Sequence, residues 1–226
     1  MTMRISLIHM GDSITFGQYL DPSLRWTTIV SNCNRKVFAG LDLEIVARTY
    51  GVSGETTRMG LERFPQDVQD YTPDILTLQY GLNDCNCWAT DKGHPRVSEA
   101  AFEANLLEMI ARTRVFGAKE IILSTNHRTL RRDTLASGEV YEDANARYCD
   151  IVREVARQAE VMLCDIQMAF DGFSDEQLAR MVMPTPDLLH LSEEGNRVYA
   201  DTIYPYIRQS IESLAGINSS TREAVT

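Results

Sequence analysis

The sequence predicts an α/β fold of three layers, in which a mainly parallel, five-stranded sheet lies between helices. Short apolar runs alternate along the chain with longer stretches of helical periodicity. Several runs are apolar at both odd and even positions, which is typical of strands covered on both faces. The expected strands are 5–10, 43–47, 75–80, 121–125 and 161–165. The length of 226 residues suits one domain, which we expect over 1–217, followed by a flexible tail at 218–226.

Helical patterns fill the gaps between the later strands. We expect Ser98 to cap a helix that Gly117 ends. A second helical pattern covers 141–159, and a third begins at Ser192. Pro205 should kink or interrupt this last helix, because proline lacks the N–H that the helix needs.

Composition excludes several classes of function. The formal net charge of −10 argues against nucleic acid as a partner. No apolar run approaches the roughly 18 residues of a membrane span, and the first residues, MTMRISLIHMGD, read as a core strand and not as a signal peptide. The 5 cysteines are odd in number and irregularly spaced, which favours free thiols in a reducing compartment. We therefore expect a cytoplasmic protein, with secretion after loss of a signal peptide as the alternative; the sequence is silent on oligomeric state.

Polar segments follow four of the expected strands. Ser13 follows the first, the loop 50–57 the second, the loop 81–86 the third, and Asn126 and His127 the fourth. Ligands of open parallel sheets bind beyond the carboxyl ends of the strands. The topology therefore predicts that these segments meet at one edge of the sheet, where a site would lie.

Four histidines are candidates for a general base. His190 is distinguished by Asp187, three residues earlier, because a helical turn would let this carboxylate orient the imidazole. The same pattern is also typical of an exposed Asp and His before a helix. His127 is the rival base at the predicted edge, whereas His9 reads as a core residue and His94 as an exposed loop residue.

Ser13 is the first candidate nucleophile, in the stretch HMGDSITFG. Gly11 would let the backbone turn sharply at the end of the strand. A helix cap or a turn would also place a serine there. Ser53 is the second candidate, but Glu55 stands where the nucleophile elbow of α/β-hydrolases requires glycine.

Acyl transfer also needs donors for the developing oxyanion. The Gly54 N–H, the Asn83 side-chain amide and the Ser13 N–H are all expected at the same edge. Taken separately, the glycine and the asparagine are equally typical of turns.

Four blocks in order, GDSIT, GVSGETT, GLND and DLLH, resemble the SGNH (GDSL) hydrolase family of esterases, lipases and deacetylases. The resemblance covers 8–196, nearly the whole chain, and the combination is far more specific than any single block. It implies a flavodoxin-like α/β/α sandwich. One departure is RTYGVSG, where family members often carry asparagine near the start of the second block.

Carried over by position, the resemblance implies a serine hydrolase that needs no cofactor. Ser13 would be the nucleophile, His190 the general base and Asp187 the acid that orients it. The oxyanion hole would consist of the Ser13 N–H, the Gly54 N–H and the Asn83 amide.

The expected reaction is hydrolysis of a small acyl ester, such as an acetyl ester, of a polar alcohol or sugar. Lysophospholipase and acyl thioesterase activities of the same family are the alternatives. A catalytically silent binding module could keep the same scaffold. A flavodoxin-like nucleotide or flavin binder is disfavoured, because no Gly-rich phosphate loop follows the first strand.

The segment 126–143 is polar and locally basic, which is typical first of a solvated loop with surface arginines and second of a lid that contacts an anionic or sugar substrate. Arg128 and His127 in this segment, together with Trp88 and Asp12, are the candidate substrate-binding residues. Asp12 has a structural hydrogen-bonding role as its main alternative.

A metal site is not expected. Cys85, Cys87 and His94 could offer three ligands, but the spacing is not that of a usual zinc site and no fourth ligand is evident. The two thiols would instead line the pocket beside Asn83.

Overall fold

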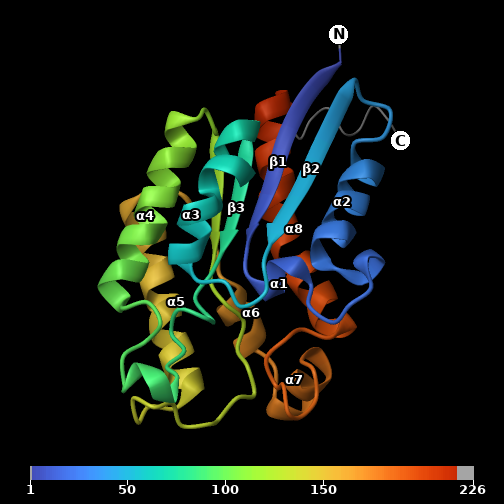
Figure 1. Ribbon diagram of the computed structural model, residues 1–226. Coiled ribbons are helices and arrows are strands. Elements are labelled where there is room, and N and C mark those ends of the chain that lie inside the picture. The colour runs from blue at the N-terminus through green and yellow to red at the C-terminus, as the bar shows by residue number, and fades with distance from the viewer. Residues whose placement is uncertain (1, 218–226) are drawn as a thin grey trace.

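A five-stranded parallel sheet forms the centre of the molecule (Figure 1). The computed structural model describes residues 2–217, and the strand order is β2-β1-β3-β4-β5. The strands are β1 (Met3–Gly11), β2 (Leu43–Gly51), β3 (Ile75–Gln79), β4 (Glu120–Ser124) and β5 (Met162–Cys164). The predicted fold class and all five strands are confirmed, and β2 continues well past its predicted end. The tail predicted at 218–226 lies outside the described residues.

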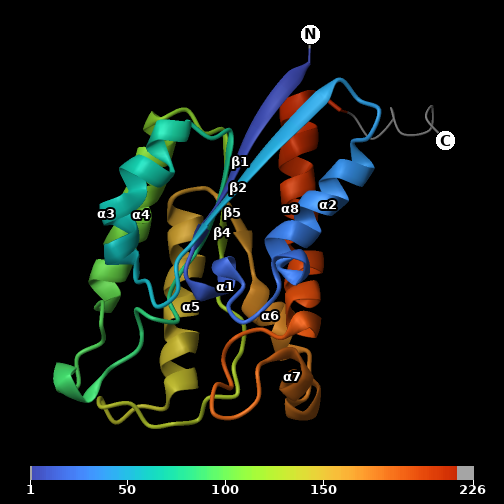
Figure 2. The same cartoon turned by 45° about the vertical axis from the view of Figure 1, so that its right-hand side comes forward.

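Helices cover both faces of the sheet, which gives the three layers (Figure 2). One layer contains α3 (Thr57–Asp67), α4 (Glu99–Val115) and α5 (Tyr141–Gln158). The other contains α2 (Trp26–Val37) and α8 (Glu193–Ala215), with α6 (Ile166–Asp171) and α7 (Asp175–Met181) beside α8. Short helical turns are α1 (Ser13–Phe16), η1 (Pro22–Leu24), η2 (Gln69–Tyr71) and η3 (Ala89–Asp91). All residues of β3 are buried, as a strand between two helical layers requires.

Two of the predicted helix starts are confirmed by their caps. The side chains of Ser98 and Ser192 each accept a backbone N–H of the first turn of the helix that follows. The predicted interruption at Pro205 is wrong, because α8 continues through it. Pro205 is exposed, whereas Ile203 and Ile207 face the core, so water can bind the carbonyl that the missing N–H leaves unpaired.

The register of the sheet brings three loops to the same level. Gly11 at the end of β1 pairs with Gly51 of β2 on one side and with Gln79 of β3 on the other. Gly51 also packs directly against α1, since a Cβ there would lie 2.1 Å from the Phe16 nitrogen. The segments that leave β1, β2 and β3 therefore begin side by side at one edge of the sheet.

Candidate active site

Ser13 is the first residue of α1, immediately beyond β1. The side chain of Asp12 caps this helix by accepting the Ile14 N–H at 2.9 Å. Gly11 is required for close packing and not, as predicted, for a sharp turn of the backbone. A Cβ at this position would lie 2.3 Å from the Thr15 Oγ1, while the φ of Gly11 is not in the left-handed region.

Ser13, His190 and Asp187 form a continuous chain of hydrogen bonds. The Ser13 Oγ lies 2.8 Å from the His190 Nε2. The His190 Nδ1 lies 2.7 Å from the Asp187 Oδ2. A hydroxyl, an imidazole and a carboxylate in this order can activate the serine oxygen as a nucleophile. Ser13 is 4% exposed, and the side chains of His190 and Asp187 are about one-fifth exposed, so an ester at the surface can reach them.

Asp187 and His190 are not on the helical turn that the sequence predicted. They lie in the loop between α7 and α8, and the contact arises from a turn built on the carboxylate. The Asp187 Oδ1 accepts the N–H groups of Leu189 at 3.0 Å and His190 at 2.6 Å. Burial acts to raise the pKa of Asp187, but the hydrogen bonds from His190 and Leu189 outweigh it and lower that pKa. The carboxylate therefore stays ionised beside the imidazole.

His127 holds this loop from inside the protein and does not reach Ser13. Its side chain is fully buried, and burial lowers its pKa to about 4. The neutral ring donates its Nε2–H to the Leu189 carbonyl, at 2.7 Å. The Leu130 N–H donates to the neighbouring Leu188 carbonyl at 2.9 Å. The residue that precedes His190 is thus fixed by a buried histidine, a role that the sequence did not indicate.

Gly54 and Asn83 both line the cavity that contains Ser13 and His190. Gly54 has a φ of 77°, and its carbonyl accepts a hydrogen bond from the Arg96 Nη1 at 3.0 Å. The Asn83 Nδ2 donates to the Glu55 carbonyl at 3.0 Å. Its second N–H has only a long contact of 3.5 Å with Asp12, so it is available to a stronger acceptor.

The cavity has a volume of about 200 Å³. Its lining residues are Ser13, Gln18, Ser53, Gly54, Leu82, Asn83, Asn86, Arg131, Tyr141, Leu189 and His190. Drug-sized ligands occupy pockets of roughly 300–1,000 Å³, so this cavity suits only a small group. Arg131 and Asn86 also line a neighbouring hollow of about 450 Å³, which extends to Trp88.

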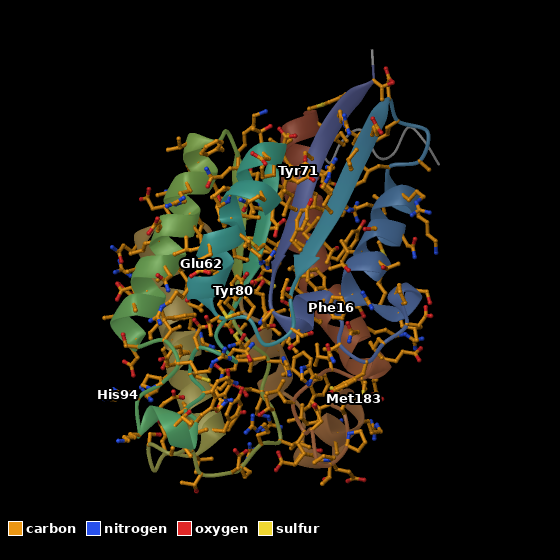
Figure 3. All side chains as sticks on the ribbon, in the orientation of Figure 1. Phe16, Glu62, Tyr71, Tyr80, His94 and Met183 are labelled. Carbon is orange, nitrogen blue, oxygen red and sulfur yellow. The ribbon has the colours of Figure 1, made fainter. Side chains whose placement is uncertain are left out.

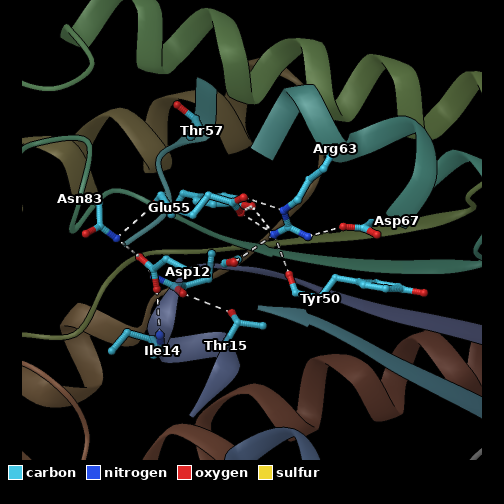
Figure 4. Close-up of polar contacts among 12 residues, drawn as sticks. Asp12, Ile14, Thr15, Tyr50, Glu55, Thr57, Arg63, Asp67 and Asn83 are labelled. Carbon is cyan, nitrogen blue, oxygen red and sulfur yellow. Dashed lines mark hydrogen bonds and ion pairs between the residues drawn. The ribbon is translucent and has the colours of Figure 1, made fainter. Parts of the chain in front are cut away.

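A buried network of charged and polar residues adjoins the cavity through Asn83, which contacts both Asp12 and Glu55 (Figure 4). The Glu55 carboxylate, 3% exposed, pairs with the guanidinium of Arg63 and accepts the Tyr80 hydroxyl at 2.8 Å. Arg63 also donates to the Tyr50 carbonyl at 2.9 Å, which ties α3 to the end of β2. Burial raises the pKa of Asp12 to about 7 despite hydrogen bonds from the Ile14 N–H and the Gln79 amide.

Of the candidate substrate-binding residues, the structure places Trp88 beside the cavity and the others away from its lining. Trp88 is 52% exposed and lines the neighbouring hollow, with the Arg96 guanidinium 4.4 Å from its ring centroid. Asp12 is fully buried and does not line the cavity. Arg128 does not line the cavity and instead donates to the Phe173 carbonyl at 2.7 Å, beside α6. In the segment 126–143, residues 126, 127, 129, 135 and 141 are buried, whereas 132–134, 136–138 and 143 are exposed. The segment is therefore anchored at both ends and exposed in most of its middle part.

His94 lies at the outer edge of the molecule, whereas Tyr80 lies in its interior (Figure 3). Across residues 2–217, no group of three His, Cys, Asp or Glu side chains is arranged to hold a metal ion.

All five cysteines are free thiols.

The comparison with known proteins decides the family. The model of the GDSL-like lipase/acylhydrolase family matches residues 9–198. The chain belongs to this family. The resemblance found in the four sequence blocks is thereby confirmed, and so is the expected class of carboxylic ester hydrolase.

Curated relatives of this GDSL-like chain include enzymes and one lipoprotein. An arylesterase of Vibrio mimicus is 26% identical over 70% of this chain and 68% of its own. The esterase TesA of Pseudomonas aeruginosa is 29% identical over about half of each chain. The uncharacterized lipoprotein YqeF of Bacillus subtilis is 27% identical over 87% of both chains.

Solved structures of similar fold include an acetylxylan esterase, Axe2 of Geobacillus stearothermophilus. Axe2 is 21% identical to this chain, and the match covers 92% of this chain and 96% of Axe2 with a TM-score of 0.69. A lipase/acylhydrolase of Enterococcus faecalis is also 21% identical, with 91% and 96% covered and a TM-score of 0.70. These likenesses confirm the fold.

No helix within the described residues has the length and apolar character of a membrane span. The cytoplasmic location stays a prediction.

Proposed function

We propose that this GDSL-like hydrolase cleaves a small acyl ester, such as an acetyl ester, of a polar alcohol or sugar. The observation that carries the proposal is the continuous chain from the Ser13 Oγ through His190 to Asp187, with distances of 2.8 and 2.7 Å. Ser13 and His190 line the small cavity that Gly54 and Asn83 also line.

The proposed reaction has two steps. The Ser13 Oγ attacks the acyl carbonyl while His190 takes its proton, and Asp187 stabilises the imidazolium that forms. The oxyanion accepts hydrogen bonds from the Ser13 N–H, the Gly54 N–H and the Asn83 amide. His190 then protonates the leaving alcohol, and a water activated by the same histidine releases the acid.

The small size of the cavity supports the choice of substrate. A volume of about 200 Å³ accommodates an acetyl group, and its walls include the polar side chains of Gln18, Asn86 and Arg131. Arg131 is paired with Asp133 through bonds of 2.9 and 2.6 Å, so its charge is already balanced. A phosphate-bearing substrate would find no unpaired charge at this guanidinium. The acetylxylan esterase among the structural neighbours is consistent with this substrate class.

Labelling with a fluorophosphonate probe tests the nucleophile. We expect the probe to label the wild-type protein and the Ser53→Ala variant. The Ser13→Ala variant should take no label. Ser53 is the matched control because it lines the same cavity and is bonded to Gln18 at 2.5 Å. An unlabelled wild-type protein would indicate the silent binding module instead.

A panel of p-nitrophenyl esters from acetyl to palmitoyl, with acetylated sugars and an acyl-CoA, tests the substrate. We expect kcat/KM to be highest for the acetyl esters. A maximum at long chains would favour the lysophospholipase alternative, and a preference for the acyl-CoA would favour a thioesterase.

A further inference from the structure

Tyr19 is an exposed aromatic residue that lies directly against His190. The two ring centroids are 5.2 Å apart at an interplanar angle of 82°, an edge-to-face contact. The side chain of Tyr19 is nevertheless 64% exposed, so most of its ring faces solvent. The loop that follows α1 and the loop that precedes α8 lie side by side in both ribbon views, which is where this contact forms (Figures 1 and 2).

The backbone of Tyr19 adopts a conformation that a tyrosine disfavours. Its φ is 69°, in the left-handed region where glycine is at ease and a bulky side chain is strained. Surrounding contacts hold the turn in place. The Gln18 N–H donates to the Ser13 carbonyl at 3.0 Å, and the Leu20 N–H donates to the Gly17 carbonyl at 3.2 Å. Residues in this conformation cluster at active sites and ligand clamps. The ring contact with His190 is what distinguishes Tyr19 from the other positive-φ residues that the structure describes.

The chemistry of the proposed reaction places the alcohol beside this ring. In the acylation step the bond from the Ser13 Oγ to the acyl carbon forms and the bond from that carbon to the alcohol oxygen breaks. The proton taken by the His190 Nε2 passes to that leaving oxygen. The leaving oxygen must therefore lie against His190, and the body of the alcohol extends away from it. Tyr19 contacts the same imidazole with a ring that is mostly exposed, and it lies outside the lining of the cavity that would hold the acyl group.

We propose that Tyr19 is a specificity-determining residue, whose ring packs against the leaving alcohol and favours alcohols whose ring presents C–H groups to it. This inference rests on the proposed function and adds the shape of the alcohol. A sugar and an aryl group share the required chemistry, since both offer a face or edge of C–H groups to an aromatic ring.

Three acetate esters isolate the effect of the alcohol: ethyl acetate, phenyl acetate and a mono-acetylated methyl glucopyranoside. All three pass through the same acetyl-enzyme, so differences in kcat/KM report the step in which the alcohol leaves. For Tyr19→Ala we expect kcat/KM to fall about three- to tenfold on the ring esters and to stay unchanged on ethyl acetate. A fall on the glucoside alone identifies a sugar, and a fall on phenyl acetate alone identifies an aryl group. Tyr19→Phe should keep the wild-type values.

A third variant separates this role from a structural one. Tyr19→Gly removes the ring but adopts a φ of 69° without strain, so it should melt no lower than Tyr19→Ala and lose the same selectivity. Glu160→Gly is the matched control, because Glu160 also has a positive φ, of 51°, and lies exposed beyond α5. This control should leave all three kcat/KM values unchanged.

Two outcomes would overturn the proposal. An equal loss on all three esters would make Tyr19 a residue that only positions His190, and no loss on any ester would leave it without a role in specificity. Failure of the proposed function has a different signature, in which the wild-type protein hydrolyses none of the three and takes no fluorophosphonate label.

Discussion

The Arg96 Nη1 donates a hydrogen bond of 3.0 Å to the carbonyl oxygen of Gly54. The same guanidinium lies 4.4 Å from the centroid of the Trp88 ring. One side chain from the loop after β3 thus fixes the loop after β2, and Gly54 itself has no side chain that could do so. The position of the proposed Gly54 donor therefore depends on an arginine 42 residues away along the chain.

Removal of this arginine should loosen the Gly54 loop. For Arg96→Met we expect kcat on p-nitrophenyl acetate to fall about ten- to a hundredfold, because small displacements of a catalytic group cost that much. Trp88→Ala removes only the ring that supports the guanidinium and should have a smaller effect. A wild-type kcat in Arg96→Met would show that the loop holds its shape without this bond.

Asn83→Ala should lower kcat about 10²–10³-fold if the amide stabilises the oxyanion. The Asn83 Nδ2 lies 3.5 Å from the Asp12 Oδ2, so the N–H that points to Asp12 is only weakly bonded and can donate to the oxyanion instead. Asn86→Ala is the matched control, since Asn86 lines the same cavity, and it should change kcat much less. An unchanged rate in Asn83→Ala would remove Asn83 from the oxyanion hole.

Asp187→Asn should lower kcat about 10⁴-fold, because an amide no longer stabilises the imidazolium or selects its tautomer. The fold of the loop should survive, as the remaining side-chain oxygen can still accept the Leu189 and His190 N–H groups. Single-turnover kinetics measures the loss of rate in this variant, and thermal unfolding measures whether its melting temperature is unchanged. Retained activity together with an unchanged melting temperature would contradict the role given to Asp187.

Arg63→Met should destabilise the protein by about 3–5 kcal/mol, because it leaves the buried Glu55 carboxylate without its partner. The free energy of unfolding in urea measures this. Arg157→Met is the matched control: its pair with Glu154 is exposed to solvent, so the expected loss is much smaller. Similar losses in both variants would mean that Glu55 is stabilised by other contacts.

Asp12 should make stability depend on pH in a defined direction. Its pKa is about 7 in the folded protein and 3.8 as the ordinary value, so the folded state holds this proton more tightly. The contribution of Asp12 to the free energy of unfolding is therefore full below about pH 4 and is lost as the pH rises through 7. The free energy of unfolding of wild type minus that of Asp12→Asn should therefore fall as the pH rises from about 4 through 7. A rise of this difference over the same range would mean that folding lowers the pKa of Asp12.

Part of the site could be predicted from the sequence because it depends on which residues directly follow each strand. The strands show in the apolar runs, and Ser13, Gly54 and Asn83 each follow a strand whose carboxyl end meets the others at one edge. The pairing of Asp187 with His190 is also local, since three residues separate them. Even there the predicted helical turn was wrong, because backbone N–H groups of the same loop hold the carboxylate.

Long-range contacts decided the rest, and no local pattern encodes them. His127 looked like a rival base, but burial makes it a neutral donor to the Leu189 carbonyl. Arg96, Arg63 and Tyr19 carry no motif, and their importance comes from partners that only folding brings near. The sequence by itself determined the family, the sheet and the order of the reacting groups. The tertiary structure decided how the Gly54 loop is held and which aromatic side chain lies against His190, because those contacts join segments that are distant along the chain.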